Sequence, residues 1–344
     1  YLFRAYLIFT VLELYFTPTE TNKFRIIQAF TGLLISGSAA FQLFIHRSRC
    51  DLCFNTSDLD LYVEHRYSLI VGKFLVWCRY EFVARPDQSQ NFAMAVTEVE
   101  GKICGYADRN YSNGRGFAGV YNFVKGGMKI QLITARNSVL DIVLNFHSTI
   151  VMNVISHSHA YLLYPRALQD KVSLICCSNE GPERDDARQK YIDCGYCMVN
   201  GDGTPWRSRA VSPPTSSPEP EFDDNELKKY FYVFQERHLN DSATWRIPLS
   251  AIDPEKDAPW IYESFFPNPA IPSFLRYENL MRSPLIEVNS WALALEESEL
   301  GLNAPLGGLR CHRHYMSQHI IYQKPSLYYV YCLSKTVMDN VGVL

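Results

Sequence analysis

The segment "DLDLYVE" at residues 58–64 constrains the fold more than any other part of the chain. Polar and apolar residues alternate along it, which predicts a β-strand with one buried face. Side chains two residues apart on a strand point to the same side. Asp58 and Asp60 are therefore expected to emerge together, while Leu59 and Leu61 point to the core. A chain with this segment must form a sheet that presents two neighbouring carboxylates.

A glycine–serine turn lies upstream of this strand, within "LLISGSAAFQLF" at residues 33–44. We expect a helix within residues 22–45 that leads into the turn, and a second short helix after it. Gly37 would let the backbone approach a phosphate closely, and Ser38 would add a hydroxyl donor. The N-terminus of the second helix would attract an anion. The turn and the aspartates together predict a site for a nucleotide and a metal ion.

The residues around the Gly126-Gly127 pair give the clearest hairpin signal, at residues 119–135. Two alternating runs flank the pair, and adjacent glycines tolerate the positive φ angles of tight two-residue turns. Apolar residues at helical spacing predict a helix within residues 64–80, and "YEFVARP" after it predicts a short strand that proline ends. The fold class that follows is α/β (α+β), with a mixed β-sheet core and helices.

The C-terminal half is expected to elaborate this core with helical and β-hairpin segments. Ser138, with Asp141 three residues later, is typical of a capping box that opens a helix. Residues 229–249, "KYFYVFQERHLNDSATWRIPL", predict a second hairpin.

The composition changes at residues 210–226, "AVSPPTSSPEPEFDDNE", where proline, serine and acidic residues replace the apolar periodicity. Such a segment is typical of a loop or linker. We therefore predict a core domain over residues 1–200, a Pro/Ser/acidic linker or loop over 201–228, and a C-terminal elaboration with aromatic-rich β segments over 229–344.

Composition bounds the class of protein. With 47% hydrophobic and 20% charged residues, the 344-residue chain matches an ordinary globular protein. Its net charge of −3 argues against a dedicated nucleic-acid binder, because such domains are usually strongly basic.

The first stretch, "YLFRAYLIFTVLELYF", is apolar but contains Arg4 and Glu13. It is also shorter than the ~20 residues that cross a bilayer, so we expect a buried helix and no membrane partner. The ten cysteines are irregularly spaced. That spacing predicts reduced thiols and a cytoplasmic or nuclear location.

The paired aspartates suggest a specific chemistry. Carboxylates about 7 Å apart on one strand face can converge on Mg²⁺, a hard cation that prefers oxygen ligands. Two such ions about 4 Å apart stabilise the attacking and the leaving oxygen of an in-line phosphoryl displacement. Asp58 and Asp60 are the residues that would hold the metal.

In this order of parts the chain resembles the nucleotidyltransferase superfamily, the fold shared by DNA polymerase beta, CCA-adding enzymes and aminoglycoside nucleotidyltransferases. Its motif is an apolar residue, Gly, then Gly or Ser, followed downstream by Asp, apolar, Asp or Glu, apolar. Here these are Ser36-Gly37-Ser38 and Asp58-Leu59-Asp60-Leu61. The likeness covers about residues 22–165. "SDLDLYVE" together with "LNFHSTIVMNVIS" is also similar to a set of uncharacterised fungal proteins with this core.

The resemblance implies a reaction and a set of roles. A nucleoside monophosphate would pass from a nucleoside triphosphate to an unknown acceptor, which could be a protein, an RNA or a small molecule. Asp58 and Asp60 would be catalytic and would hold Mg²⁺. The residues expected to bind the nucleotide are Gly37, Ser38, Lys129 and Gln131.

The chain departs from the superfamily at the third carboxylate, which active members place on a later strand. Gln131 in "GMKIQLI" occupies the expected position, and a neutral amide supplies no charge. Asp141 and Glu64 are the other acids considered, and neither restores the pattern. Two functions therefore stay open: a nucleotidyltransferase, and a catalytically degenerate module for nucleotide binding or protein interaction.

Other metal sites are weaker alternatives. Cys50/Cys53 and Cys194/Cys197 form two Cys-x-x-Cys pairs that could together hold zinc, but they are far apart in the chain. "CHRHYMSQH" at residues 311–319 gathers one cysteine and three histidines, for which an exposed polar turn is the favoured interpretation.

Overall fold

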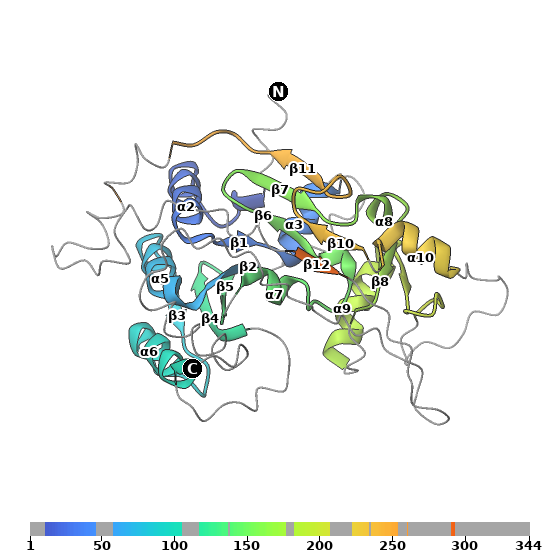
Figure 1. Ribbon diagram of the computed structural model, residues 1–344. Coiled ribbons are helices and arrows are strands. Elements are labelled where there is room, and N and C mark those ends of the chain that lie inside the picture. Colours follow the sequence, from blue (N-terminus) through green and yellow to red (C-terminus); the bar gives the residue numbers. More distant parts are fainter. Residues whose placement is uncertain are drawn as a thin grey trace, which may run out of the picture.

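The computed structural model of the protein describes residues 11–45, 58–104, 117–136, 138–176, 182–206, 222–233, 235–253, 260 and 290–292. Its centre is an eight-stranded sheet with the order β11-β7-β6-β1-β2-β5-β4-β3 (Figure 1). Its eight strands make seven contacts with neighbouring strands, of which six are antiparallel and one, β2–β5, is parallel. The expected α/β (α+β) class with a mixed sheet is confirmed. The strands of this sheet are β1 Leu34–Ile35, β2 Leu59–Glu64, β3 Glu81–Val83, β4 Phe117–Lys125, β5 Met128–Ala135, β6 Asn153–Ile155, β7 His159–Leu162 and β11 Trp245–Pro248.

Two small sheets accompany the main one. β8 and β9 pair parallel, and β10 and β12 pair antiparallel. Their bounds are β8 Val172–Leu174, β9 Cys197–Val199, β10 Glu236–His238 and β12 Ser290–Ala292.

Helices connect and cover the strands. The longest, α2, begins at a capping box between Thr17 and Glu20 and ends at Gly32 in the left-handed conformation, so both ends follow from local chemistry. The helices are α2 Pro18–Thr31, α3 Gly37–Phe44, α5 Ser68–Trp77, α6 Phe92–Cys104, α7 Val139–Val143, α8 Pro165–Gln169, α9 Pro182–Asp193 and α10 Asp224–Phe231, with short 3-10 turns at His65–Tyr67 and Thr149–Val151.

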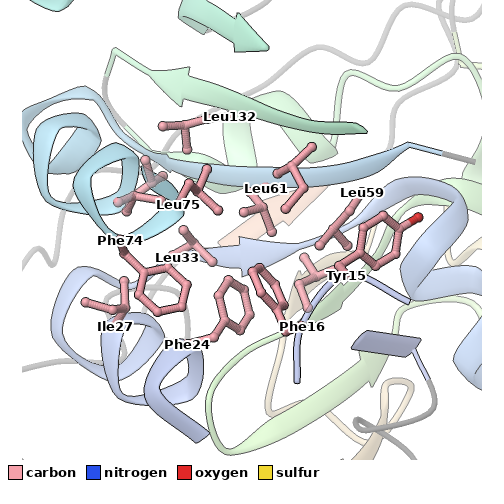
Figure 2. Packing of buried hydrophobic residues seen from close by; sticks show 14 of the residues in the cluster. Tyr15, Phe16, Phe24, Ile27, Leu33, Leu59, Leu61, Phe74, Leu75 and Leu132 are labelled. Atoms are coloured by element: carbon pink, nitrogen blue, oxygen red, sulfur yellow. The ribbon is translucent and has the colours of Figure 1, made fainter. Parts of the chain in front are cut away.

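One hydrophobic cluster joins the central strands to α2, α5 and α6. Leu59, Leu61 and Val63 of β2 are fully buried in it, as the alternation of this strand predicts. Figure 2 shows aromatic and leucine side chains from the helices that close over Leu59 and Leu61. Phe16 and Phe24 stack with ring centroids 5.1 Å apart. This cluster holds β2 in place and leaves its polar face toward the other side of the sheet.

A second cluster lies around Tyr62 on that other side, with α7, α8 and α10. Tyr62 alternates with Leu61 and Val63, so the strand is buried on both faces beyond Asp60. Within β2, the polar residues Asp60 and Glu64 are partly exposed, and Asp60 is the one at the start of the strand.

The local expectations near the core are largely confirmed. The hairpin at residues 119–135 forms as β4 and β5, with Lys125 opposite Met128 across the two glycines. A helix (α5) and a short strand (β3) also lie where they are predicted. The helix before the glycine turn begins earlier than expected, at Pro18, and the two-residue strand β1 separates it from α3.

Two expectations are wrong. Residues 229–249 do not form a hairpin, because β10 pairs with β12 whereas β11 extends the main sheet beside β7. Ser138 precedes α7 but its side chain makes no capping hydrogen bond. The helix α10, Asp224–Phe231, begins within the end of the predicted 201–228 linker. A capping box between Asp223 and Glu226 opens it. Residues 207–221 lie outside the described chain, and the division into domains stays a prediction.

The apolar N-terminal stretch is described only from Val11 onward. There Val11, Leu12 and Phe16 are buried in the first cluster. Among the described residues, no helix is both long and apolar enough to cross a bilayer.

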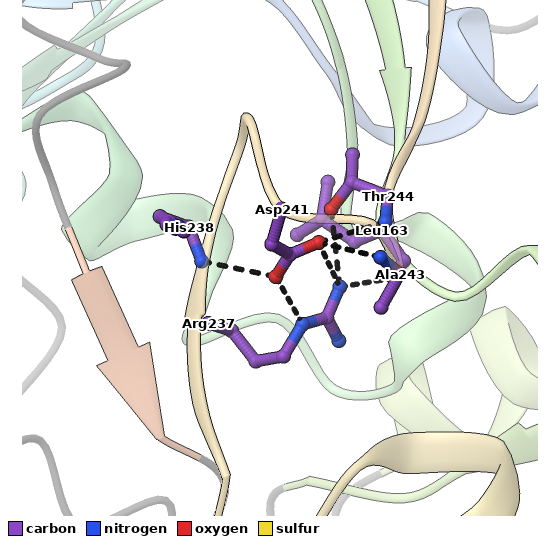
Figure 3. Close-up of polar contacts among 6 residues, drawn as sticks. All are labelled: Leu163, Arg237, His238, Asp241, Ala243 and Thr244. Carbon is purple, nitrogen blue, oxygen red and sulfur yellow. Dashed lines mark hydrogen bonds and ion pairs between the residues drawn. The ribbon is translucent and has the colours of Figure 1, made fainter.

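A buried arginine ties the C-terminal strands to the core. Arg237 of β10 forms an ion pair with Asp241, with 2.5 Å between Nε and Oδ2, and donates to the carbonyl of Leu163 and the hydroxyl of Thr244 (Figure 3). Its guanidinium also lies 4.5 Å from the ring centre of Tyr232. Burial alone would raise the pKa of Asp241, but the bonds and charge of Arg237 lower it below its usual value.

We expect Asp241→Asn to lower the free energy of unfolding by about 3 kcal/mol, because it leaves the charge of Arg237 buried without a counter-ion. Asp87→Asn is the matched control, since Asp87 forms an exposed ion pair with Arg85 and such pairs contribute about 0–1 kcal/mol. Chemical denaturation of both variants measures the difference. Equal losses would show that Arg237–Asp241 does not anchor β10.

A buried histidine gives the fold a pH dependence. Burial lowers the pKa of His65 to about 4, while its ring contacts Thr134 and the carbonyl of Val96. The unfolded chain takes up this proton near pH 6.5 and the folded chain does not. The free energy of unfolding should therefore fall as pH decreases from 6.5 to about 4, by at most about 1.4 kcal/mol per pH unit for this group.

Denaturation curves across this pH range test the point. His65→Gln should flatten the profile in this window, whereas His238→Gln, at an exposed position, should leave it unchanged. A profile that keeps its slope in His65→Gln would assign the effect to other groups.

Candidate functional site

The two aspartates lie at the start of β2, on the same side of the sheet. Asp58 directly precedes the strand and Asp60 is its second residue. β2 pairs in parallel with β5, so Asp60 lies opposite Gln131. The same register, continued by one residue beyond Leu59 and Ile130, brings Asp58 level with Lys129. Lys129 Nζ and Asp58 Oδ2 are 2.6 Å apart, and each side chain is about one third exposed, at 37% and 36%.

A polar row crosses three neighbouring strands at this level. Asp60 of β2 lies opposite Gln131 of β5, and Gln131 lies opposite Asn122 of β4. Gln131 Nε2 donates to Asn122 Oδ1 over 3.2 Å. Gln131 thus lies beside the aspartates on the face that the sequence predicts for it.

The glycine turn reaches the same point because β1 pairs antiparallel with β2. Ile35 lies opposite Leu61, and the chain then turns at Gly37 with φ of +69°. A Cβ atom on Gly37 would lie 3.2 Å from Asp60 Oδ2, which is closer than ordinary van der Waals contact. The two parts of the motif, 20 residues apart in the sequence, therefore meet in space.

The N-terminus of α3 opens beside Asp60. Ser36 is its N-cap residue, but its side chain makes no capping bond and donates instead to the carbonyl of Asn153 over 2.6 Å. The side chain of Ser36 therefore forms no hydrogen bond with the first amide groups of α3. Such amide groups at a helix N-terminus attract anions. Ser38, in the first turn, is partly exposed.

Asp60 has an unusual charge state. Burial, together with the charge of Asp58, raises its pKa to about 7, although the charges of Lys129 and Lys190 act to lower it. Near neutral pH the carboxyl is therefore divided between its neutral and charged forms.

Several residues near the aspartates have no clear signal in the sequence. Lys190 and Tyr191 belong to α9, and both interact electrostatically with Asp60. The ring of Tyr191 meets that of Phe41 of α3 edge-on, with centroids 5.4 Å apart, so α9 packs against the helix that follows the glycine turn. Tyr62, whose pKa burial raises, could have been found by alternation, because it lies two residues after Asp60.

Two further basic residues of the described chain, Lys125 and Arg66, form ion pairs with glutamates. Lys125 lies 3.8 Å from Glu20 of α2. Arg66 pairs with Glu64 over 2.7 Å. Arg47 and Arg49 lie outside the described residues. Lys129 and Lys190 are therefore the described lysines that act on Asp60.

Among the described side chains, no other acidic residue supplies the third carboxylate of the superfamily pattern. Glu64 is four residues from Asp60 along the strand, about 13 Å away, and it pairs with Arg66. The side chain of Asp141 lies outside the described part of the chain.

These residues do not fit the pair of Mg²⁺ ions that the superfamily implies. Mg²⁺ requires nearly octahedral oxygen coordination. Here one oxygen of Asp58 is bound by an ammonium group, and the third position is an amide that already bonds to Asn122. The described chain gathers no group of three or more His, Cys, Asp or Glu residues that could hold a metal ion.

The alternative metal sites gain no support. Among the described residues, Cys194 and Cys197 belong to no group of three or more His, Cys, Asp or Glu that could hold a metal ion. Cys50, Cys53 and the cluster at residues 311–319 lie outside the described residues.

Comparison with protein-family profiles gave no match, and comparison with curated proteins gave none. Among solved structures, the Thermotoga maritima CCA-adding enzyme complexed with tRNA is similar at a TM-score of 0.35 and 15% identity. The match covers 56% of this chain and 42% of that enzyme, so it extends over less than half of the enzyme's length. A TM-score this low supports no conclusion about function, and the likeness to fungal proteins finds no support in these comparisons.

The contact between Gly37 and Asp60 predicts the effect of a single methyl group. Gly37→Ala should lower the free energy of unfolding by about 1–2 kcal/mol, because alanine is strained at positive φ. It should also displace the carboxylate of Asp60. Gly32→Ala is the matched control, since Gly32 has φ of +65° and no atom within 4 Å of an added Cβ.

Chemical denaturation measures the loss of unfolding free energy in each of the two variants. NMR measures the chemical shift of the Asp60 carboxyl carbon. We expect that shift to change in Gly37→Ala and to stay unchanged in Gly32→Ala. An unchanged Asp60 signal in both variants would place Gly37 away from the carboxylate.

Proposed function

We propose that the chain is a nucleoside triphosphate-binding module of nucleotidyltransferase type. In this proposal the edge of the sheet that binds the nucleotide is retained, whereas catalysis by two metal ions is not. The observation that carries the proposal is the meeting of Asp60, Gly37 and Lys129 at one edge of the sheet. At this edge the N-terminus of α3, the turn at Gly37 and the ammonium group of Lys129 lie together.

This edge suits a polyphosphate for two reasons. The first amide groups of α3 supply hydrogen-bond donors and the positive end of the helix dipole. Lys129 and Lys190 add positive charge close to Asp60, and lysine binds phosphate as a point charge.

The polar row argues against catalysis as the main role. Gln131 stands where a third carboxylate would be, and a neutral amide cannot act as general base for an acceptor hydroxyl. Its amide group is already engaged with Asn122. The hydrogen bond between Gln131 and Asn122 thus holds this row together without involving a metal ion.

A second candidate is nucleotidyl transfer from a nucleoside triphosphate to an acceptor, which could be a protein, an RNA or a small molecule. The pairing of Asp58 and Asp60 beside the glycine turn favours it. In this reading Mg²⁺ would accompany the nucleotide. We further infer a cytoplasmic or nuclear location from the irregular spacing of the ten cysteines.

A charge placed at the first turn of α3 tests the proposal. Titration calorimetry with each of the four nucleoside triphosphates should show binding of at least one to the unmodified chain. Ser38→Glu should weaken that binding tenfold or more, because a carboxylate beside the first amides repels phosphate. The same variant should fold normally, since an acidic residue stabilises a helix N-terminus.

Gln42→Glu is the matched control, with the same charge one turn further along α3 at a partly exposed position. It should bind nucleotide as the unmodified chain does. Binding of no nucleotide, or equal loss in both variants, would contradict the proposal. Mg²⁺-dependent transfer of label from a radioactive nucleotide to any acceptor would favour the second candidate instead.

A further inference from the structure

The ammonium group of Lys129 occupies the place where a cation would neutralise Asp58. The distance from Nζ to Oδ2 is 2.6 Å, which is a short charge-assisted hydrogen bond. The arrangement comes from the backbone, because the register of β2 and β5 brings the two residues level. Lys129 is therefore a fixed part of this edge.

A divalent ion at Asp58 and this ammonium group repel each other. An ion bound to Asp58 would lie within about 4 Å of Nζ, and a dication and an ammonium at that distance repel about twice as strongly as two unit charges. A protonated lysine also offers only donors and cannot ligate a metal. The loss of acid at Gln131 removes a further negative charge that would hold the ion.

Lys129 can serve a phosphate while it serves Asp58. The ammonium group has three donors, and the bond to Asp58 uses one. Both side chains are about one third exposed, so a ligand at the edge can reach the remaining donors. Lys190 of α9 adds a second positive charge near Asp60.

We propose that Lys129 replaces the divalent cation of this site, so that the chain binds the phosphates of a nucleoside triphosphate without a metal ion. The inference rests on the proposed function, since it states how the same edge neutralises its ligand. It also identifies Lys129 as the residue on which affinity depends.

The experiment is calorimetric titration of the full chain with the nucleoside triphosphate that binds best, once in EDTA and once in Mg²⁺. The unmodified chain should bind with dissociation constants that agree within about threefold, a difference of less than 1 kcal/mol. Lys129→Gln should weaken binding in EDTA tenfold or more.

Lys125→Gln is the matched control. Lys125 lies on the same hairpin, is exposed to a similar degree at 35% and forms an ion pair with Glu20. It alternates with Val124, which lies opposite Lys129, and so belongs to the other face of the sheet. Its substitution should leave nucleotide binding unchanged.

A double variant tests the inference in the opposite direction. Lys129→Gln combined with Gln131→Glu removes the ammonium and adds a carboxylate opposite Asp60. This variant should bind the nucleotide only when Mg²⁺ is present. The same affinity in EDTA as in Mg²⁺ would show that Lys129 does not set the metal dependence.

The outcomes separate the two claims. Binding by the unmodified chain only in Mg²⁺ would overturn the inference and leave the proposed function standing. Unchanged binding in Lys129→Gln would also overturn it. Absence of binding in both conditions would overturn the proposed function, and the inference with it.

Discussion

The parallel pairing of β2 with β5 is the constraint on which the site depends. It is the one parallel contact of the described main sheet, and it sets Asp60 opposite Gln131 and Asp58 level with Lys129. Buried leucines on the other face of both strands fix this register, because a slip of one residue would move Asp60 into the core. The identity of the residues facing the aspartates is therefore decided by packing on the opposite side of the sheet.

The antiparallel pairing of β1 with β2 adds the glycine turn to the same level. Together the two registers bring Gly37, Asp60 and Lys129 to one edge, where the ammonium group of Lys129 lies 2.6 Å from Asp58. The side chains of the Lys129–Asp58 ion pair are about one third exposed, and such surface pairs contribute about 0–1 kcal/mol to stability. Its importance lies in where it puts a positive charge, and much less in the stability of the fold.

The sequence predicts the parts of this arrangement that depend on local patterns. Alternation along residues 58–64 identifies β2 and the shared face of its aspartates, and Gly126-Gly127 identifies the hairpin that carries Gln131. Alternation also predicts that Gln131 and Lys129 share one face of the second strand of this hairpin. The roles of these residues in binding or catalysis stay predictions.

The parts that the sequence does not predict depend on contacts between distant segments. β1 has only two residues, too few for a periodic signal, yet it places Gly37. The ion pair of Lys129 with Asp58 requires a cross-strand register that alternation alone does not give. α9 brings Lys190 near Asp60 through packing on Phe41, and residues 229–249 fail as a hairpin because their strands find other partners.

The most direct measurement is a crystal structure of the chain grown with a nucleoside triphosphate and Mn²⁺, a divalent ion that anomalous scattering locates. The account predicts phosphate density between the N-terminus of α3 and Lys129, with the Lys129–Asp58 contact intact and no anomalous peak at Asp58 or Asp60. A manganese peak bridging the two aspartates, with the lysine displaced, would contradict it.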